Sequence, residues 1–241
     1  MAIRKLTPAG LCCCLLATFA APTAHADETN WYVAAKASLA QITLDNTRAS
    51  NIGTGNVIGG EIDGAISDVD DTDYTAGLGF AVGYRWSRWA AEAEYIYRYR
   101  TDWDVVAPTP SISTITNVFS NVETHSLVLN LLRHGRLSEK WRWHAGVGVG
   151  WVSNKVEAEF LERATATNPE FSTEDDASSS DFTYSVLAGV TRPINDRLDL
   201  GVRYRYLPLG DLEAGSFDNR PARLSGEHDA HEIQFSLEFT W

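Results

Sequence analysis

The strict alternation of apolar and polar residues constrains this chain most. In the last eleven residues, HEIQFSLEFTW, every second side chain is large and apolar: Ile233, Phe235, Leu237, Phe239 and Trp241. Successive side chains of a β-strand point to opposite faces, so this segment is predicted to be a strand with one apolar face. The same period of two recurs along the chain, whereas helical periodicity does not. The chain is therefore predicted to be all-β.

Eight alternating segments stand out, approximately at residues 31–44, 73–85, 89–101, 122–133, 141–156, 181–192, 197–207 and 230–241. Short connections (86–88, 134–140, 193–196) alternate with long polar ones (45–72, 102–121, 157–180, 208–229). Bacterial outer-membrane barrels have an even strand number, short periplasmic turns and long external loops. The sequence predicts an eight-stranded antiparallel up-and-down transmembrane β-barrel with both termini periplasmic.

The first 26 residues have the pattern of a secretory signal peptide. Arg4 and Lys5 precede an apolar run, and Ala24-His25-Ala26 supplies a small-x-small cleavage site. We therefore expect a signal peptide over 1–26 and an outer-membrane barrel over 27–241. All cysteines lie within the signal, so we expect no disulfide or thiolate metal site in the mature chain. A lipoprotein reading is weaker, because the residues before Cys12 have the wrong order for a lipid-attachment box.

The orientation of the two strand faces distinguishes a soluble barrel from a membrane barrel. Aromatic residues cluster near the ends of the apolar faces, as in interfacial girdles, and glycines on the opposite faces suit a narrow lumen. We therefore expect the apolar faces to contact lipid. The opposite faces carry a predicted lumen charge network: Lys36, Glu92, Glu94, Arg98, Arg100, Arg203, Arg205, Glu232 and Glu238. Within it, Glu232 is expected to pair with Arg205, and Glu92 to lie diagonal to Arg85.

Composition excludes one class of function and leaves a metal question open. The formal net charge of −12 argues against a nucleic-acid binder, which needs basic surfaces. The predicted loops are acidic, and SDVDDTD could ligate a hard cation through Asp68, Asp70, Asp71 and Asp73. The segment lacks the glycine and terminal glutamate of a helix-loop-helix calcium motif, so solvated charge is the plainer account. We expect no resident metal and no cofactor.

The chain resembles small outer-membrane barrels of the opacity-protein and OmpA-transmembrane type, grouped as porin-family proteins. The resemblance covers essentially the whole mature chain and rests on NWYVAAKASLAQ, HSLVLNLLRHG, WRWHAGVGVGW, LDLGVRYRYLPLGDLE and AHEIQFSLEFTW. It implies that Phe239 and Trp241 form the C-terminal signal for the barrel-assembly machinery, although most relatives end in Phe. It also implies a bacterial outer-membrane location, with membrane lipid, lipopolysaccharide and a host or cell-surface ligand as partners.

The function that we infer is structural, or an interaction at the surface through acidic external loops. The alternative is a narrow porin-like channel for small solutes, but the side chains of so small a barrel normally fill its lumen. A lipid-modifying enzyme is the third possibility, and His125-Ser126 is its nearest candidate pair. Adjacent strand residues point to opposite faces, so these two cannot form a dyad, and we expect no enzyme.

Overall fold

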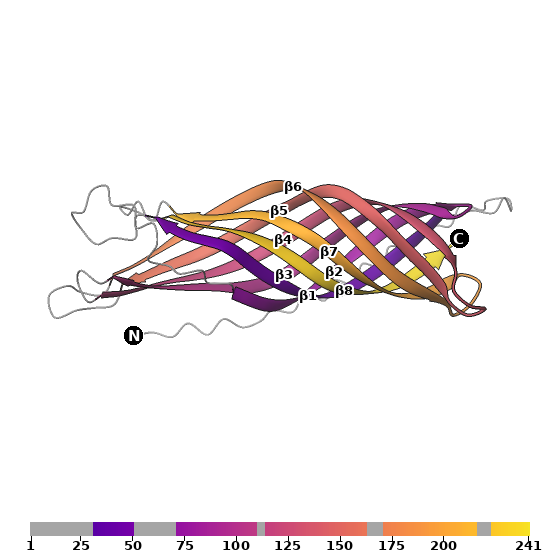
Figure 1. Ribbon diagram of the computed structural model, residues 1–241, viewed down its shortest axis with the longest axis horizontal. Helices are drawn as coiled ribbons and strands as arrows, with labels where there is room; N and C mark the ends of the chain where they lie inside the picture. Colours follow the sequence, from indigo (N-terminus) through magenta and orange to yellow (C-terminus); the bar gives the residue numbers. More distant parts are fainter. Residues whose placement is uncertain (1–30, 51–70, 110–113, 163–170, 216–222) are drawn as a thin grey trace, which may run out of the picture.

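The computed structural model describes residues 31–50, 71–109, 114–162, 171–215 and 223–241, which form a barrel (Figure 1). Its strands are β1 (Trp31–Ser50), β2 (Asp71–Trp86), β3 (Trp89–Thr109), β4 (Thr114–Arg136), β5 (Arg142–Glu162), β6 (Phe171–Pro193), β7 (Leu198–Gly215) and β8 (Arg223–Thr240). Each strand pairs antiparallel with its sequence neighbours, and β1 pairs with β8 to close the ring. This confirms the predicted fold. The expected signal peptide lies outside the described residues.

Short turns join the strands at one end of the barrel, which we call the turn end. The β2–β3 turn is the tightest, because Trp86 pairs with Trp89 and Ser87 takes a φ of 52°. In the β6–β7 turn, the Asn195 carboxamide oxygen accepts hydrogen bonds from the backbone N–H groups of Arg197 and Leu198, both at 2.9 Å. The C-terminal strand β8 also ends here (Figure 1). The opposite end, where the strands project furthest, we call the extended end.

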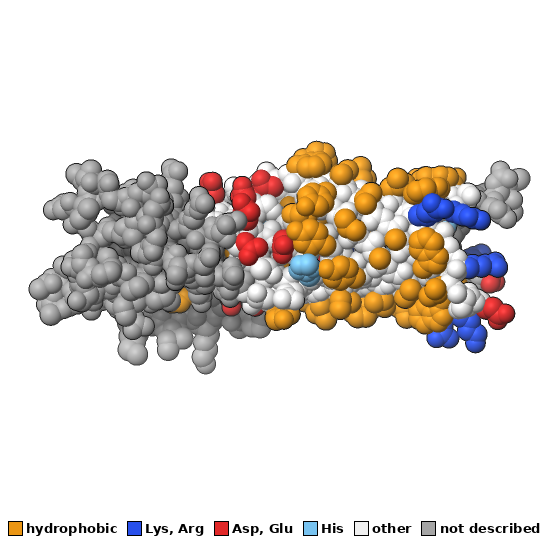
Figure 2. All heavy atoms as spheres, in the orientation of Figure 1, with side chains coloured by type: hydrophobic (Ala, Val, Ile, Leu, Met, Phe, Trp, Pro, Cys, Tyr) orange, Lys and Arg blue, Asp and Glu red, His pale blue; other side chains and the backbone are white. Residues whose placement is uncertain are grey.

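The outer face carries the large apolar side chains, in a band visible in Figure 2. Aromatic residues border this band as two belts. The turn-end belt contains Trp31, Tyr84, Trp86, Trp89, Trp141, Phe239 and Trp241, and the extended-end belt contains Tyr74, Tyr99, Trp151, Phe182 and Tyr184. Such a band between aromatic belts is the outer surface of a transmembrane barrel, so the prediction that the apolar faces contact lipid agrees with the structure. None of the described residues forms a helix long and apolar enough to cross a membrane.

The strands are longer than the sequence pattern indicated, and most of the excess lies beyond the extended-end belt. Strand β5 was expected to end at residue 156 and continues to Glu162, while β6 begins at Phe171 instead of residue 181. Much of what was expected to be loop therefore belongs to the barrel wall. The reason is a change of solvent. Outside the bilayer the exterior meets water, so charged residues such as Glu159 face outward and Val156 and Ala158 face inward.

Three register shifts adjust the described wall near and beyond the extended-end belt. The first shifts β3–β4 between Arg98 and Thr101, the second shifts β7–β8 between Pro208 and Gly210, and the third lies in the β1–β8 ladder. Gly210 has a φ of +87°, and a Cβ atom there would meet the side chain of Asp181. Glycine is therefore required at the second bulge, because the backbone has a positive φ and because no room is left for a Cβ atom.

Candidate functional site

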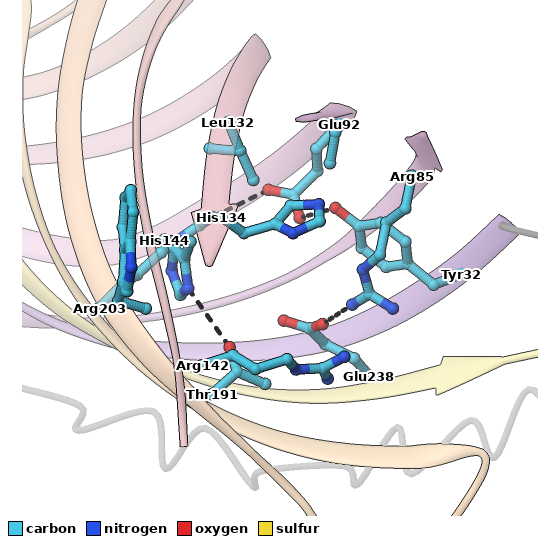
Figure 3. A pocket seen from close by; sticks show the side chains of 12 residues that line it. Tyr32, Arg85, Glu92, Leu132, His134, Arg142, His144, Thr191, Arg203 and Glu238 are labelled. Carbon is cyan, nitrogen blue, oxygen red and sulfur yellow. Dashed lines mark hydrogen bonds and ion pairs between the residues drawn. The ribbon is translucent and has the colours of Figure 1, made fainter. Parts of the chain in front are cut away.

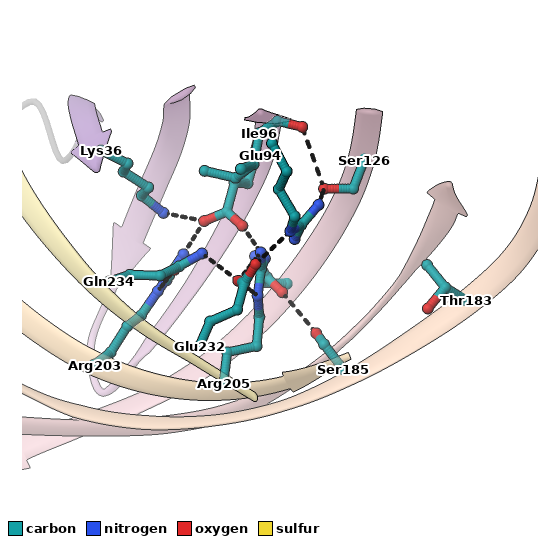
Figure 4. Close-up of polar contacts among 12 residues, drawn as sticks. Lys36, Glu94, Ile96, Ser126, Thr183, Ser185, Arg203, Arg205, Glu232 and Gln234 are labelled. Carbon is teal, nitrogen blue, oxygen red and sulfur yellow. Dashed lines mark hydrogen bonds and ion pairs between the residues drawn. The ribbon is translucent and has the colours of Figure 1, made fainter. Parts of the chain in front are cut away.

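Ion pairs cross the lumen from β7 to β3, which stand opposite each other in the closed ring (Figure 4). The Arg203 guanidinium donates to Glu92, with 2.9 Å between Nη1 and Oε1, and also to Glu94. Arg205 donates to Glu94 as well. Because each link joins opposite walls, these side chains span the whole width of the lumen.

Four further residues complete this central network. Glu232 on β8 accepts from Arg98 Nε and from Arg205 Nη2, each at 2.5 Å. The Gln234 carboxamide oxygen accepts from Arg203 Nε at 2.5 Å. Lys36 on β1 donates to Glu92 at 2.6 Å and to Glu94. Four strands thus contribute to one connected set of charges.

Burial makes this pairing obligatory. The side chains of Arg205 and Glu232 are 0% exposed, and that of Glu94 is equally buried. An isolated charge in such a place is prohibitive, whereas paired and hydrogen-bonded charges are tolerated. The network therefore fixes how the walls face each other, and it fills the lumen at this level.

A pocket lies beside the network toward the turn end (Figure 3). Its lining includes the ion pair of Arg85 with Glu238, and Arg142, which pairs with Asp199 outside the lining. Tyr32 donates to Glu92 at 2.9 Å, and the Arg85 guanidinium lies 4.1 Å from the centroid of the Tyr32 ring. The pocket is thus a polar recess that ends at the central network.

On the other side of the network, toward the extended end, the lumen holds an apolar layer beside buried polar side chains such as Thr124 and Asn154. Its packed cluster consists of Ala40, Ile42, Val128, Val152, Leu207, Leu209 and Ala230. Its β1 members follow Lys36 along that strand and its β7 members follow Arg205, so the cluster forms the next layer of the filling. The sequence pattern had indicated small or polar lumen faces throughout, and this layer was not foreseen.

The structure places eight of the nine residues of the predicted charge network on the lumen wall: Lys36, Glu92, Glu94, Arg98, Arg203, Arg205, Glu232 and Glu238. The expected pair of Glu232 with Arg205 is present across β7 and β8. Glu92 lies opposite Gly83 and hence diagonal to Arg85, but Arg85 forms its ion pair with Glu238 instead. The predicted network did not include Arg142, Tyr32 and Gln234. The available signal was their place in the alternation, which puts each on the lumen-facing side of its strand.

Arg100 was wrongly placed in the lumen. The bulge after Arg98 puts Arg100 on the outer surface and turns Thr101 inward. There Arg100 pairs with Glu123 at 2.9 Å and with Glu157 at 3.1 Å. A strict alternation of faces does not account for an extra residue. Beyond the bulge it therefore assigns lumen-facing residues to the exterior and exterior residues to the lumen.

This outer charge row lies beyond the extended-end belt and is exposed to water. Lys155 donates to Glu157 at 2.7 Å. This hydrogen bond, followed by the nearby charges of Arg100 and Lys155, lowers the pKa of the Glu157 carboxyl below its usual range. Glu157 therefore stays ionised at neutral pH, and salt screens the exposed row.

The remaining candidates do not gather into a site. Phe239 and Trp241 face outward in the turn-end belt. Asp73 accepts the backbone N–H groups of Tyr74 (2.7 Å) and Asp102 (3.0 Å). Asp68 and Asp70 lie outside the described residues, as does the side chain of Asp71. Over the described ranges, no three His, Cys, Asp or Glu side chains are grouped as metal ligands. His125 faces outward and Ser126 is buried in the lumen.

A family model, described as the outer membrane protein beta-barrel domain, matches residues 11–239. The chain belongs to this family. Membership indicates the bacterial outer membrane as its location. No curated protein matches the chain.

Among solved structures, this family member is similar to several outer-membrane proteins at low identity. Neisserial surface protein A is 14% identical, with a TM-score of 0.42, covering 88% of this chain and 98% of that one. OprG from Pseudomonas aeruginosa is 13% identical, with a TM-score of 0.49, and the match covers 88% of this chain and 97% of that one. Ail of Yersinia pestis, solved with the heparin analogue sucrose octasulfate, is 11% identical, with a TM-score of 0.34. The match covers 84% of this chain and 98% of that one.

Proposed function

We propose that this protein is a structural outer-membrane barrel with a sealed lumen, and that it interacts with its surroundings through its outer surfaces. In this proposal the turn end is periplasmic and the extended end is external, in keeping with the short turns on one side. The acidic residues near the extended end and the basic residues near the turn end support this orientation (Figure 2). Phe239 and Trp241 serve as the C-terminal assembly signal.

The observation that carries the proposal is the filling of the lumen. Arginines of β7 reach carboxylates of β3 across its full width, and an apolar layer follows on the extended side. A hydrated ion or a sugar needs a continuous wet path, and buried ion pairs next to packed aliphatic side chains supply none. A channel would require both layers to rearrange together. Sealing therefore favours a role at the surface over transport.

Solute release from proteoliposomes tests this function. Vesicles loaded with a small sugar and carrying folded protein should release it no faster than empty vesicles. A variant with Glu94→Ala, Arg205→Ala and Glu232→Ala in the network and Leu207→Ala and Leu209→Ala in the apolar layer removes side chains of both layers, and it provides the positive control for an opened lumen. Gel mobility before and after heating identifies the folded fraction of each protein. Rapid release by the unmodified protein would establish the channel alternative.

A further inference from the structure

Two matching clusters lie on the outer face of the barrel, at the extended side of the apolar band. The β3–β4 cluster consists of Tyr95, Tyr97, Glu123 and His125, and the β7–β8 cluster of Tyr204, Tyr206, Asp229 and His231. Each has a Tyr-x-Tyr on one strand and an acid-x-His on the next. The two strand pairs are four strands apart in a closed ring of eight, so the clusters stand on opposite sides of the barrel.

Their geometries agree closely. The tyrosine hydroxyl to histidine Nδ1 distance is 2.7 Å for Tyr95 and His125 and 2.6 Å for Tyr204 and His231. The corresponding ring centroids are 6.1 Å apart in both clusters.

The second tyrosine of each cluster repeats the correspondence. It lies directly opposite the histidine, with ring centroids 5.0 Å apart for Tyr97 and 5.1 Å apart for Tyr206. In the β7–β8 cluster this tyrosine also donates to the acid, with 3.2 Å between the Tyr206 hydroxyl and Asp229 Oδ2, whereas in the β3–β4 cluster the acid Glu123 accepts from Arg100. Ordinary belt residues require only an amphipathic ring, so a correspondence in four residue positions and three contacts indicates a common task.

The hydrogen bonds determine what each cluster offers. A neutral imidazole has one acceptor and one donor nitrogen. Because an imidazole nitrogen accepts more strongly than a phenolic oxygen, we assign the tyrosine hydroxyl as donor to Nδ1, which leaves the hydrogen on Nε2. Each cluster then presents an N–H donor and tyrosine ring faces within one patch. The carboxylate beside them is Asp229, whose Oδ2 accepts from Tyr206, or Glu123, which pairs with Arg100.

The clusters lie at the depth where lipid headgroups begin. Tyr97 lies two residues before Tyr99 of the extended-end belt, and Tyr206 pairs with Val186, two residues after Tyr184 of that belt. A headgroup bound there has its acyl chains along the apolar band below. We propose that each cluster binds the sugar headgroup of a glycolipid.

The chemistry of the patch favours a sugar over a phosphate. Sugar hydroxyls can donate to the carboxylate and accept from the histidine N–H, while the carbon face of the sugar ring packs on tyrosine. A phosphate headgroup would instead meet a like charge at Asp229. In the β3–β4 cluster Arg100 partly neutralises Glu123, so discrimination against anionic lipid should be sharper in the β7–β8 cluster. The inference goes beyond the proposed function and does not depend on whether the lumen conducts.

Native mass spectrometry of protein released from defined nanodiscs tests the inference. The nanodiscs contain equal parts of monoglucosyl diacylglycerol and phosphatidylglycerol with the same acyl chains. We expect two retained glucosyl lipids per barrel. His125→Phe and His231→Phe should each weaken retention at one cluster, and the double variant should weaken it at both. These substitutions keep an aromatic ring on an exposed position, and heat-shifted gel mobility verifies folding. Tyr74→Phe, a belt residue outside both clusters, is the control and should retain two.

Competition between the two lipids measures how strongly each substitution weakens retention of the glucosyl lipid. Loss of the histidine hydrogen bond should weaken retention at that cluster about fivefold, the usual effect of one neutral hydrogen bond. Unchanged glucosyl-lipid retention in the folded double variant would overturn the proposal. Equal retention of phosphatidylglycerol by the unmodified protein would overturn it too, because the clusters would then be general lipid contacts.

Discussion

Arg205 and Glu232 face each other across β7 and β8 with both side chains fully buried, 2.5 Å apart between Nη2 and Oε2. Arg205 also donates to Glu94 on β3, and Glu232 also accepts from Arg98. This pair therefore joins the wall formed by β7 and β8 to the opposite wall. The barrel is held not only by its backbone ladder but also by charges through its centre.

Removing one member of this network should be severe. Glu232→Ala leaves Arg98 and Arg205 without their shared carboxylate in a buried site, and we expect it to lower the free energy of unfolding by about 3–5 kcal/mol. Arg100→Gln breaks exposed ion pairs and should change it by only about 0–1 kcal/mol. Denaturant titration in lipid vesicles measures both. Similar losses for the two variants would contradict the assignment of Glu232 to the lumen and Arg100 to the exterior.

Arginine substitutions on the outer face should report depth in the bilayer. Leu129 is exposed midway between the two belts, so Leu129→Arg should destabilise the folded barrel in a bilayer by about 2–4 kcal/mol. Leu200 lies near the turn-end belt, because it pairs with Leu237, two residues from Phe239. Leu200→Arg should therefore destabilise the barrel less, by about 0–1 kcal/mol. A larger effect at Leu200 than at Leu129 would show that the belts do not mark the membrane boundaries.

The apolar layer of the lumen should behave as a protein core. Leu209 is buried within it, so Leu209→Ala should leave a cavity and destabilise the barrel by about 2–5 kcal/mol. Leu127→Ala on the outer face removes a side chain from fluid lipid, which refills the space, and should have the smaller effect. Unfolding free energies in vesicles compare the two. Equal losses would mean that the extended half of the lumen is not tightly packed.

The bulge glycine gives a local test of backbone geometry. Gly210→Ala should destabilise the barrel by about 1–3 kcal/mol, because φ is positive there and Asp181 occupies the space of a Cβ atom. Ser87 also has a positive φ, in an exposed turn, so Ser87→Gly should be neutral or slightly stabilising. The temperature at which heating shifts the gel mobility of the folded barrel measures the stability of both variants. A neutral Gly210→Ala would argue against the register shift at this position.

Sequence pattern was sufficient for the strand number, the closure and the lipid-facing side, because a bilayer imposes one polarity on the outer face of every strand. It was sufficient for the pairing of Arg205 with Glu232, because register follows from that polarity. It failed at Arg100, where a bulge adds a residue that alternation cannot detect. It also failed for Leu207, Leu209 and the strand extensions, because the preference reverses where lipid gives way to water.

Single-channel recording from the refolded protein in a planar bilayer tests the sealed lumen most directly. Only protein whose gel mobility shifts on heating is used, so that every inserted molecule is a folded barrel. We expect no current steps, because Arg203 and Arg205 remain bound to the β3 carboxylates and the apolar layer stays dry. Discrete, reproducible steps that change in size when Arg203 and Arg205 are replaced would contradict the sealed lumen and show that ions pass through it.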